Sequence, residues 1–339
     1  MAHILETMPN YRSKITARLP RLASLVTLVL VLWFGVASTA HAEDANPNPN
    51  PTDAPALIAT PVASPVGAVT PAPVTASVRP AKVINLYAVD NQPTQLTLAW
   101  EQPPTVNAET ISDYRVTYKF DDFGSWITWK HVATEDTRIT IPNLPLGVGI
   151  TFAIRPITAN FAGLPAKLHL NTPSPPAVQL AGIQQRNEYA FVAANWNSRA
   201  VSRYGYYPSR DCANWASQAL LRRGFLQTAK WHGRTSRSHG ASMAWISSTK
   251  LRDYLLATGK VTLLTDAQRN RVQVGDIVQF DWWNTGMQEH TGIVSAIIPA
   301  VDGLKIYYAS HTAHGMWWSV DRSIHVSYPG ATVSYLHVN

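Results

Sequence analysis

Residues 210–220 read RDCANWASQAL, and this stretch decides how the C-terminal half of the chain is interpreted. Asp211 belongs to the residue types that cap helix N-termini, and Gly224 stands where a helix that begins there would stop. The stretch therefore predicts a helix over 211–223. Its first turn contains Cys212, the only cysteine among the 339 residues of the chain.

Helices are predicted on both sides of this stretch, and strands follow them. Residues 184–196 carry apolar side chains at helical spacing, and Ser247 or Ser248 can cap a third helix that runs to about Ala257. After Val261 the pattern becomes that of short strands. These strands are predicted at 276–282, 291–298, 304–310, 323–328 and 332–338. Helices followed by a meander of strands indicate an α+β fold.

Residues 80–170 have a different pattern, in which apolar and polar residues alternate. The alternating sets are Leu96, Leu98 and Trp100, then Tyr114, Val116 and Tyr118, then Phe152, Ile154 and Pro156. Turn residues separate the sets, which predicts an all-β sandwich of short strands. The pattern resembles a fibronectin type III domain. That resemblance implies a spacer or a module held close to carbohydrate, and it assigns no activity.

The N-terminus has the pattern of an export signal. Four basic residues precede an uncharged apolar run at 22–36, and Ala40-His41-Ala42 follows it. The run is about 15 residues long, which is short of the roughly 20 that a membrane-spanning helix needs. A signal peptide over 1–42, cleaved after Ala42, is therefore favoured over an uncleaved anchor. We expect a mature protein without a transmembrane helix, secreted and extracellular or associated with the cell wall.

Proline-rich segments divide the rest of the chain. We interpret 43–79 as a linker without a core, 80–170 as the sandwich, 171–182 as a second linker and 183–339 as the domain that carries the chemistry. Residues 43–177 have a net charge of −3 and residues 178–339 a net charge of +7. Extracellular polyanions such as cell-wall polymers suit that basic charge. No basic run interleaved with aromatic residues occurs, so no nucleic-acid partner is expected.

The single cysteine of an exported chain has no partner for an internal disulfide. Three interpretations remain for Cys212, namely a buried apolar residue, an intermolecular bridge or a nucleophile. Its place in the first turn of a helix favours the thiolate. The adjacent Asp211 disfavours the thiolate unless its carboxylate is engaged in capping. A nucleophilic Cys212 therefore needs a cationic partner, for which histidine is suited because it can later protonate the leaving group.

Position in the predicted strands sorts the candidate histidines. The candidates are His232, His239, His290, His311, His314, His325 and His337. His290 opens one strand and His311 ends the next, and a hairpin turn at Asp302-Gly303 would bring them close together. Cysteine, histidine and a polar orienting residue are then expected to converge. The alternative for His290 is a structural histidine.

A family resemblance supports this arrangement. DCANWASQAL resembles the DCxNFxSQxL element of the putative amidase family, which belongs to the papain-like superfamily together with the NlpC and CHAP cell-wall hydrolases. Further correspondences are Arg186, Tyr189, Trp231, Trp245, Gly275-Asp276, the His290-x-Gly-Ile-Val strand and Ser310-His311-Thr312. The resemblance implies a papain-like α+β domain with N-terminal helices packed on an antiparallel sheet. It also implies Cys212 as nucleophile, His290 as base and His311 as third catalytic residue.

Other residues of the predicted site have weaker claims. Asn214 and Gln218 share the helix of Cys212 and are suited to orientation or oxyanion support, although packing explains them equally well. Two aromatic pairs flank the histidine strands and are candidates for stacking on substrate or for the core, namely Trp282 with Trp283 and Trp317 with Trp318. Asp276 and Asp281 are better explained as structural than as catalytic.

The favoured function is an exported cysteine amidase or peptidase that cuts peptidoglycan amides through an acyl-enzyme, without a cofactor or metal. One alternative is a zinc hydrolase that uses His290, His311 and His314, although no familiar zinc motif accompanies them and Cys212 would be left unexplained. Another alternative is a wall-binding or adhesive protein without turnover.

The export signal yields the first prediction. We expect the mature protein to begin at Glu43, because signal peptidase recognises small residues such as Ala40 and Ala42 after an apolar core. The intact mass of the protein recovered from the medium or the cell wall measures this. A mature extracellular form that retains residues 1–42 would contradict the prediction.

Overall fold

The computed structural model describes residues 79–104, 110–122, 125–198, 203–208, 211–234, 240–312 and 314–339. The predicted signal peptide and the predicted linker up to residue 78 lie outside these residues. Within the described part, no helix combines the length and apolar character needed to cross a membrane.

The first described part of the chain is all β. Its strands are β1 (Ile84–Gln92), β2 (Gln95–Glu101), β3 (Asp113–Phe120), β4 (Ile127–Ala133), β5 (Arg138–Pro142), β6 (Gly149–Ile157) and β7 (Ala166–Asn171). They form two antiparallel sheets in the orders β1-β2-β5 and β4-β3-β6-β7. Alternate side chains such as Leu96, Leu98 and Tyr114 enter a common core. The predicted β-sandwich is confirmed.

The second part begins with helices. These are α3 (Ile183–Asn195), α4 (Asp211–Arg222), α5 (Met243–Ile246) and α6 (Ser248–Ala257). Gly224 and Gly259 follow α4 and α6 with φ of +102° and +67°, conformations that glycine adopts without strain. Helix α4 begins at Asp211 itself, so Asp211 is the first helical residue rather than the cap before it. Ser247 caps α6 by accepting a hydrogen bond from the backbone N–H of Lys250.

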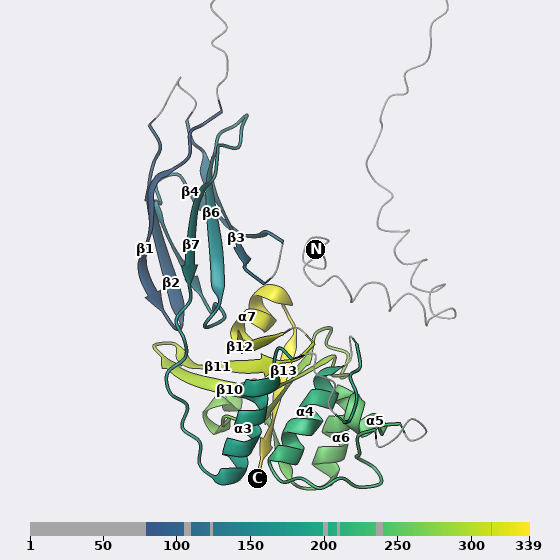
Figure 1. Ribbon diagram of the computed structural model, residues 1–339. Helices are drawn as coiled ribbons and strands as arrows, with labels where there is room; N and C mark the ends of the chain where they lie inside the picture. The colour runs from purple at the N-terminus through teal and green to yellow at the C-terminus, as the bar shows by residue number, and fades with distance from the viewer. Residues whose placement is uncertain are drawn as a thin grey trace, which may run out of the picture. The chain divides into compact units, whose positions relative to one another are not determined.

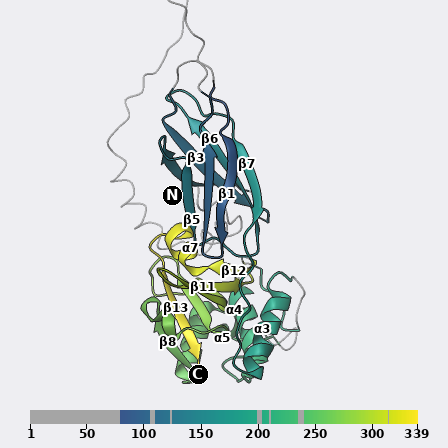
Figure 2. The ribbon, with the colours of Figure 1, turned by 90° about the vertical axis from the view of Figure 1, so that its left-hand side faces the viewer.

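A six-stranded antiparallel sheet follows, in the order β12-β11-β10-β9-β13-β8. Its strands are β8 (Val261–Thr265), β9 (Ile277–Asp281), β10 (His290–Ala300), β11 (Gly303–Ser310), β12 (Gly315–Ser319) and β13 (Thr332–Val338). Figures 1 and 2 both show α3 and α4 side by side next to this sheet, and α4 packs against β10. Helices followed by an antiparallel sheet are the α+β arrangement that the sequence predicts.

One predicted strand is wrong. Residues 323–328 were expected to be extended, but Val320–Arg322 (α7) and Ser323–Ser327 form consecutive helical turns, the second of them π-helical. Ser319 starts the turns by accepting a hydrogen bond from the N–H of Arg322. The hydroxyl of Ser323 then donates to the carbonyl oxygen of Ser319 and lies 3.0 Å from the hydroxyl of Tyr308. These local hydrogen bonds outweigh the alternating pattern.

A buried ion pair joins the first two helices. A guanidinium nitrogen of Arg223, just after α4, donates to a carboxylate oxygen of Glu188 on α3 at 2.7 Å, and the Glu188 side chain is fully buried. Burial raises the pKa of Glu188, and the charge of Arg223 opposes this rise. Removing either Glu188 or Arg223 is therefore expected to weaken the packing of α3 against α4.

We expect Arg223→Met to lower the free energy of unfolding by about 2 kcal/mol, because the buried carboxyl group of Glu188 would lose its hydrogen-bond partner. Lys250→Met is the matched control, since Lys250 pairs with Asp253 at 3.3 Å with both side chains largely exposed. Its effect should stay below about 0.5 kcal/mol. Urea unfolding followed by tryptophan fluorescence measures both, and equal effects would contradict the prediction.

Candidate functional site

Several elements meet where β9 ends, β10 begins and β11 ends, which we call the edge of the six-stranded sheet. Strand β10 runs antiparallel to both β9 and β11, so its first residue, His290, lies opposite Phe280 near the end of β9. The end of β11 at Ser310, with His311 directly after it, lies at the same edge. Strand pairing thus places His290 and His311 at the same edge.

Helix α4 brings Cys212 to this edge. Ala213 and Ala216 pack with Ile293 of β10 and Ala309 of β11, and their small side chains let the helix lie close to the sheet. Cys212 is 7% exposed. Its Sγ lies 3.6 Å from Oγ of Ser248, the first residue of α6. The thiol is therefore held between two helix N-termini.

Gln279 connects this thiol pocket to the strand of His290. Its Nε2 donates to the carbonyl oxygen of Ser248 at 2.8 Å and to Oγ1 of Thr291 at 3.1 Å. The contacts therefore run from Cys212 through Ser248 and Gln279 to the residue beside His290.

His290 is surrounded by aromatic side chains and is 8% exposed. Its ring stacks on Trp282 at 6.1 Å and meets Tyr308 edge-on at 6.2 Å, and its Nε2 lies 2.8 Å from Oγ of Ser310. Burial lowers the pKa of His290 to about 4. At neutral pH the imidazole is therefore uncharged, in contrast to the cationic partner that the sequence predicts for the thiol.

The predicted convergence is only partly seen. Among the described residues, no hydrogen bond joins Cys212 to His290. His290 shares a strand face with Phe280 and Tyr308, whereas α4 packs on the opposite face with Ile293 and Ala309. The two side chains lie at one edge of the sheet without direct contact.

His311 contacts the nucleophile helix and not His290. Its Nδ1 lies 2.6 Å from Oδ2 of Asp211, and its Nε2 lies 2.7 Å from the carbonyl oxygen of Ser198. Its ring stacks on Trp215 of α4 at 5.9 Å with an interplanar angle of 9°. Ser310, which the sequence analysis does not identify as an orienting residue, stands beside His290 instead.

Asn214 acts as a strut within the first turn of α4. Its Nδ2 donates to Oδ1 of Asp211 and to the carbonyl oxygen of Gly205, and its Oδ1 accepts from Nε1 of Trp245. These bonds occupy the side chain in packing. Gln218 is buried further along α4.

The two aspartates hold turns. The carboxylate of Asp276 accepts from the N–H groups of Gln273 and Val338 and contacts His337. That of Asp281 accepts from the N–H groups of Thr285 and Gly286. Both arrangements agree with a structural role.

The aromatic pairs differ from each other. Trp282 covers His290 and stacks on Tyr328 at 4.2 Å, and Trp283 is 50% exposed beside the same tyrosine. Trp317 and Trp318 pack instead among core residues, with Trp318 edge-on to Phe120 at 5.8 Å. The hypothesis of substrate stacking therefore keeps geometric support for Trp283 and loses it for Trp317 and Trp318, whose rings contact other parts of the protein.

The histidines proposed for zinc do not gather. His311 and His314 are edge-on neighbours at 5.2 Å, but Nδ1 of His314 lies 3.1 Å from the carbonyl oxygen of Trp196, and His290 binds Ser310. The described residues contain no group of three or more His, Cys, Asp and Glu side chains placed to share a metal ion.

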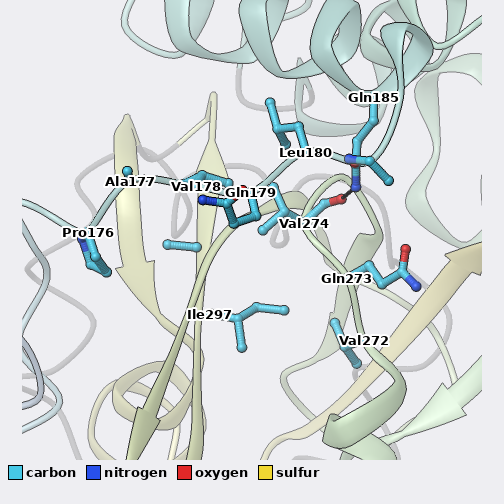
Figure 3. A pocket seen from close by; sticks show the side chains of 12 residues that line it. Pro176, Ala177, Val178, Gln179, Leu180, Gln185, Val272, Gln273, Val274 and Ile297 are labelled. Atoms are coloured by element: carbon cyan, nitrogen blue, oxygen red, sulfur yellow. Dashed lines mark hydrogen bonds between the residues drawn. The ribbon is translucent and has the colours of Figure 1, made fainter.

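A cavity of about 560 Å³ lies elsewhere, between the segment before α3 and the start of the sheet. Gln185 and Val274 both line this cavity, and Figure 3 shows the hydrogen bond that Nε2 of Gln185 donates to the carbonyl oxygen of Val274. Its lining includes Leu180, Val272 and Ile297 and none of the predicted site residues. The sheet edge with Cys212 therefore remains the candidate site.

Residues 183–335 match the model of a family described as "Putative amidase domain". This match supports amide hydrolysis as the general chemistry of the C-terminal part. The chain is also 26% identical over 87 residues to human Myomesin-2, a match that covers 26% of this chain and 6% of that protein.

The N-terminal sandwich resembles fibronectin type III domains of solved structures. The fourth such domain of a human protein is 16% identical, with a TM-score of 0.28 and coverage of 35% of this chain and 96% of that chain. Domains of titin are 17% identical, with a TM-score of 0.26 and coverage of 28% and 33%.

Ser248, Gln279 and Ser310 complete the site, and sequence reasoning missed them. Ser310 directly precedes His311, and strand alternation turns neighbouring side chains to opposite faces. Which of the two side chains contacts His290 therefore depends on the strand register, which the sequence does not determine.

The burial of His290 predicts a dependence of stability on pH. Because its pKa is about 4 when folded and near 6.5 when unfolded, the unfolded chain binds a proton first as the pH falls. Stability is therefore lost between about pH 6.5 and pH 4. We expect His290→Phe to remove up to about 3 kcal/mol of this loss.

Urea unfolding at pH 7, 5.5 and 4.5 measures the slope. An unchanged slope in His290→Phe would show that His290 is not held uncharged by burial.

Proposed function

We propose that the protein is an exported cysteine amidase or peptidase that hydrolyses amide bonds of peptidoglycan. The observation that carries the proposal is the position of Cys212. It stands in the first turn of a buried helix, at the sheet edge that also holds His290, and within the residues that match an amidase family.

In the proposed reaction, His290 takes the proton of the Cys212 thiol as sulfur attacks the amide carbonyl carbon. The C–N bond then breaks, and the imidazolium returns the proton to the leaving amine. Water, deprotonated by the same imidazole, attacks the thioester and releases a carboxylic acid and the free thiol. The backbone N–H of Cys212 at the helix N-terminus supplies part of the oxyanion hole.

The contact between His290 and Ser310 suits this base. With Nε2–H donating to Oγ of Ser310 at 2.8 Å, Nδ1 keeps the lone pair that accepts the proton. The low pKa of His290 keeps that lone pair available at neutral pH. Because His290 and α4 lie on opposite faces of the sheet, the proposal requires a change in the position of the imidazole or of the thiol when substrate binds, so that the proton can pass between them.

A papain-like arrangement follows from the same proposal, with α4 carrying the nucleophile against an antiparallel sheet that carries the base. Ser310 takes the orienting place beside the base that was expected for His311. Export is inferred from residues 1–42, and the net charge of +7 over residues 178–339 suits an anionic cell-wall polymer. The sandwich then acts as a spacer.

We expect Cys212→Ser and His290→Ala each to lower turnover by about a thousandfold or more, because nucleophile and base act as one unit. The double variant should be little slower than either single variant. The assay incubates the protein with purified peptidoglycan and identifies new amine and carboxyl termini by mass spectrometry.

Exposed His325 supplies the control, since His325→Ala should retain activity. Alkylation should abolish hydrolysis and a chelator should leave it intact. If Cys212→Ser keeps activity and a chelator removes it, a zinc hydrolase replaces the proposal. If the wild-type protein binds peptidoglycan but releases no new termini, a wall-binding protein does.

A further inference from the structure

Asp211 directly precedes the proposed nucleophile in the first turn of α4 and is 3% exposed. Its Oδ1 accepts hydrogen bonds from the backbone N–H of Tyr207 and from Nδ2 of Asn214, and its Oδ2 faces His311 at 2.6 Å. Both oxygens are therefore engaged. The contact with His311 is an ion-pair contact and lacks the straight geometry of a hydrogen bond.

The hydrogen-bonding partners of His311 fix the charge of this pair. A carbonyl oxygen only accepts, so Nε2 of His311 carries a hydrogen toward Ser198. Two lone pairs would repel each other at 2.6 Å, so a second proton lies between Nδ1 and Oδ2, either on Nδ1, which gives imidazolium beside carboxylate, or on Asp211, which gives two neutral groups. The pair has no net charge in either case.

The pair also ties distant segments to the helix. Through Ser198 and Tyr207, His311 and Asp211 hold two loop segments that lie between α3 and α4. The ring of His311 stacks on Trp215, and the rings of Tyr206 and His314 meet it edge-on at 6.1 Å and 5.2 Å. The imidazole is thus enclosed on all these sides and has one orientation.

We propose that His311 is a positioning residue that acts through Asp211, by fixing the first turn of α4 and by cancelling the negative charge beside Cys212. The inference rests on the proposed function in that it takes Cys212 as the nucleophile. It assigns His311 to the thiol side of the site, whereas a third catalytic residue would act on His290.

Charge supplies the test that separates this role from simple packing. Removing His311 leaves an uncompensated carboxylate next to the thiol, and a neighbouring negative charge disfavours the thiolate. Removing the carboxylate as well takes that charge away. Loss of His311 should therefore lower the rate at which the Cys212 thiol is alkylated, and the additional loss of the Asp211 carboxylate should restore that rate. A purely structural role predicts instead that the second substitution lowers the rate further.

The experiment measures alkylation of the folded full-length protein by iodoacetamide across pH, and the single cysteine makes the label specific to Cys212. We expect His311→Gln to slow alkylation at pH 7 about tenfold and to move the profile to higher pH. Asp211→Asn with His311→Gln should return to within about threefold of the wild type, and Asp211→Asn alone should not be slower than the wild type.

His325→Gln is the control, because this imidazole is exposed and lies outside the contacts described for Asp211 and His311. It should retain the wild-type profile. Circular dichroism and thermal unfolding report whether each variant folds. If His311→Gln does not fold, the double variant decides: a folded and reactive protein supports the proposal, and an unfolded or slow one overturns it.

An unchanged rate in His311→Gln, or a double variant no faster than His311→Gln, also overturns the inference. Because alkylation requires no substrate, this outcome is separate from that of the proposed function. A wild-type protein that fails to hydrolyse peptidoglycan would leave the alkylation result valid as a statement about the thiol.

Discussion

Burial of the polar first turn of α4 is the constraint on which the C-terminal domain depends. Ten of the 12 residues of α4 are buried, among them Asp211, Asn214, Ser217 and Gln218. Burying such groups is costly unless each finds a partner. Ser217 accordingly donates to the carbonyl oxygen of Trp245 and accepts from Nε1 of Trp231. The tryptophans that flank α4 therefore serve as hydrogen-bond partners as well as core residues.

The same constraint places the site at the sheet edge. Alanines on α4 allow close approach to β10 and β11, and this approach brings the helix N-terminus next to the ends of the strands. The polar groups gathered there are excluded from water and must bind one another. Ser248 with Cys212, Ser310 with His290 and His311 with Asp211 are the resulting contacts. A concentration of buried ionisable groups of this kind is typical of functional sites.

The sequence predicted the elements whose signals are local. Glycines after α4 and α6, the cap at Ser247 and the turn at Gly303 mark boundaries that the structure keeps. The strand expected at 323–328 failed because Ser319 and Ser323 satisfy their own backbone locally, which an alternating pattern does not reveal. Strand β12 was missed, because Trp317 and Trp318 were considered as candidates for substrate stacking or for the core and their segment was not examined as a strand.

The positions of the candidate residues in the fold were predictable from the sequence, and their contacts were less so. Cys212, His290 and His311 do lie at one edge, because the hairpin from β10 to β11 and the helix over 211–222 place them there. Both of these elements can be predicted from the sequence. Which histidine meets which partner depends on strand face. A shift of one residue in the strand pairing would exchange the sheet faces on which the side chains of Ser310 and His311 lie. The observed pairing of His290 with Phe280 and of Ile293 with Ala309 determines which side chain lies on which face.

In the proposed arrangement, these pairs add no net charge around Cys212 at neutral pH. Burial holds His290 uncharged, and Asp211 and His311 compensate each other. In the proposed reaction, charge then arises only when the proton leaves sulfur and the carbonyl oxygen becomes an oxyanion. A site that excludes water strengthens the interaction of that charge with fixed dipoles, here the N–H groups at the start of α4. An uncompensated Asp211 would oppose both the thiolate and the oxyanion. A carboxylate is therefore tolerable beside the nucleophile only with its partner in place.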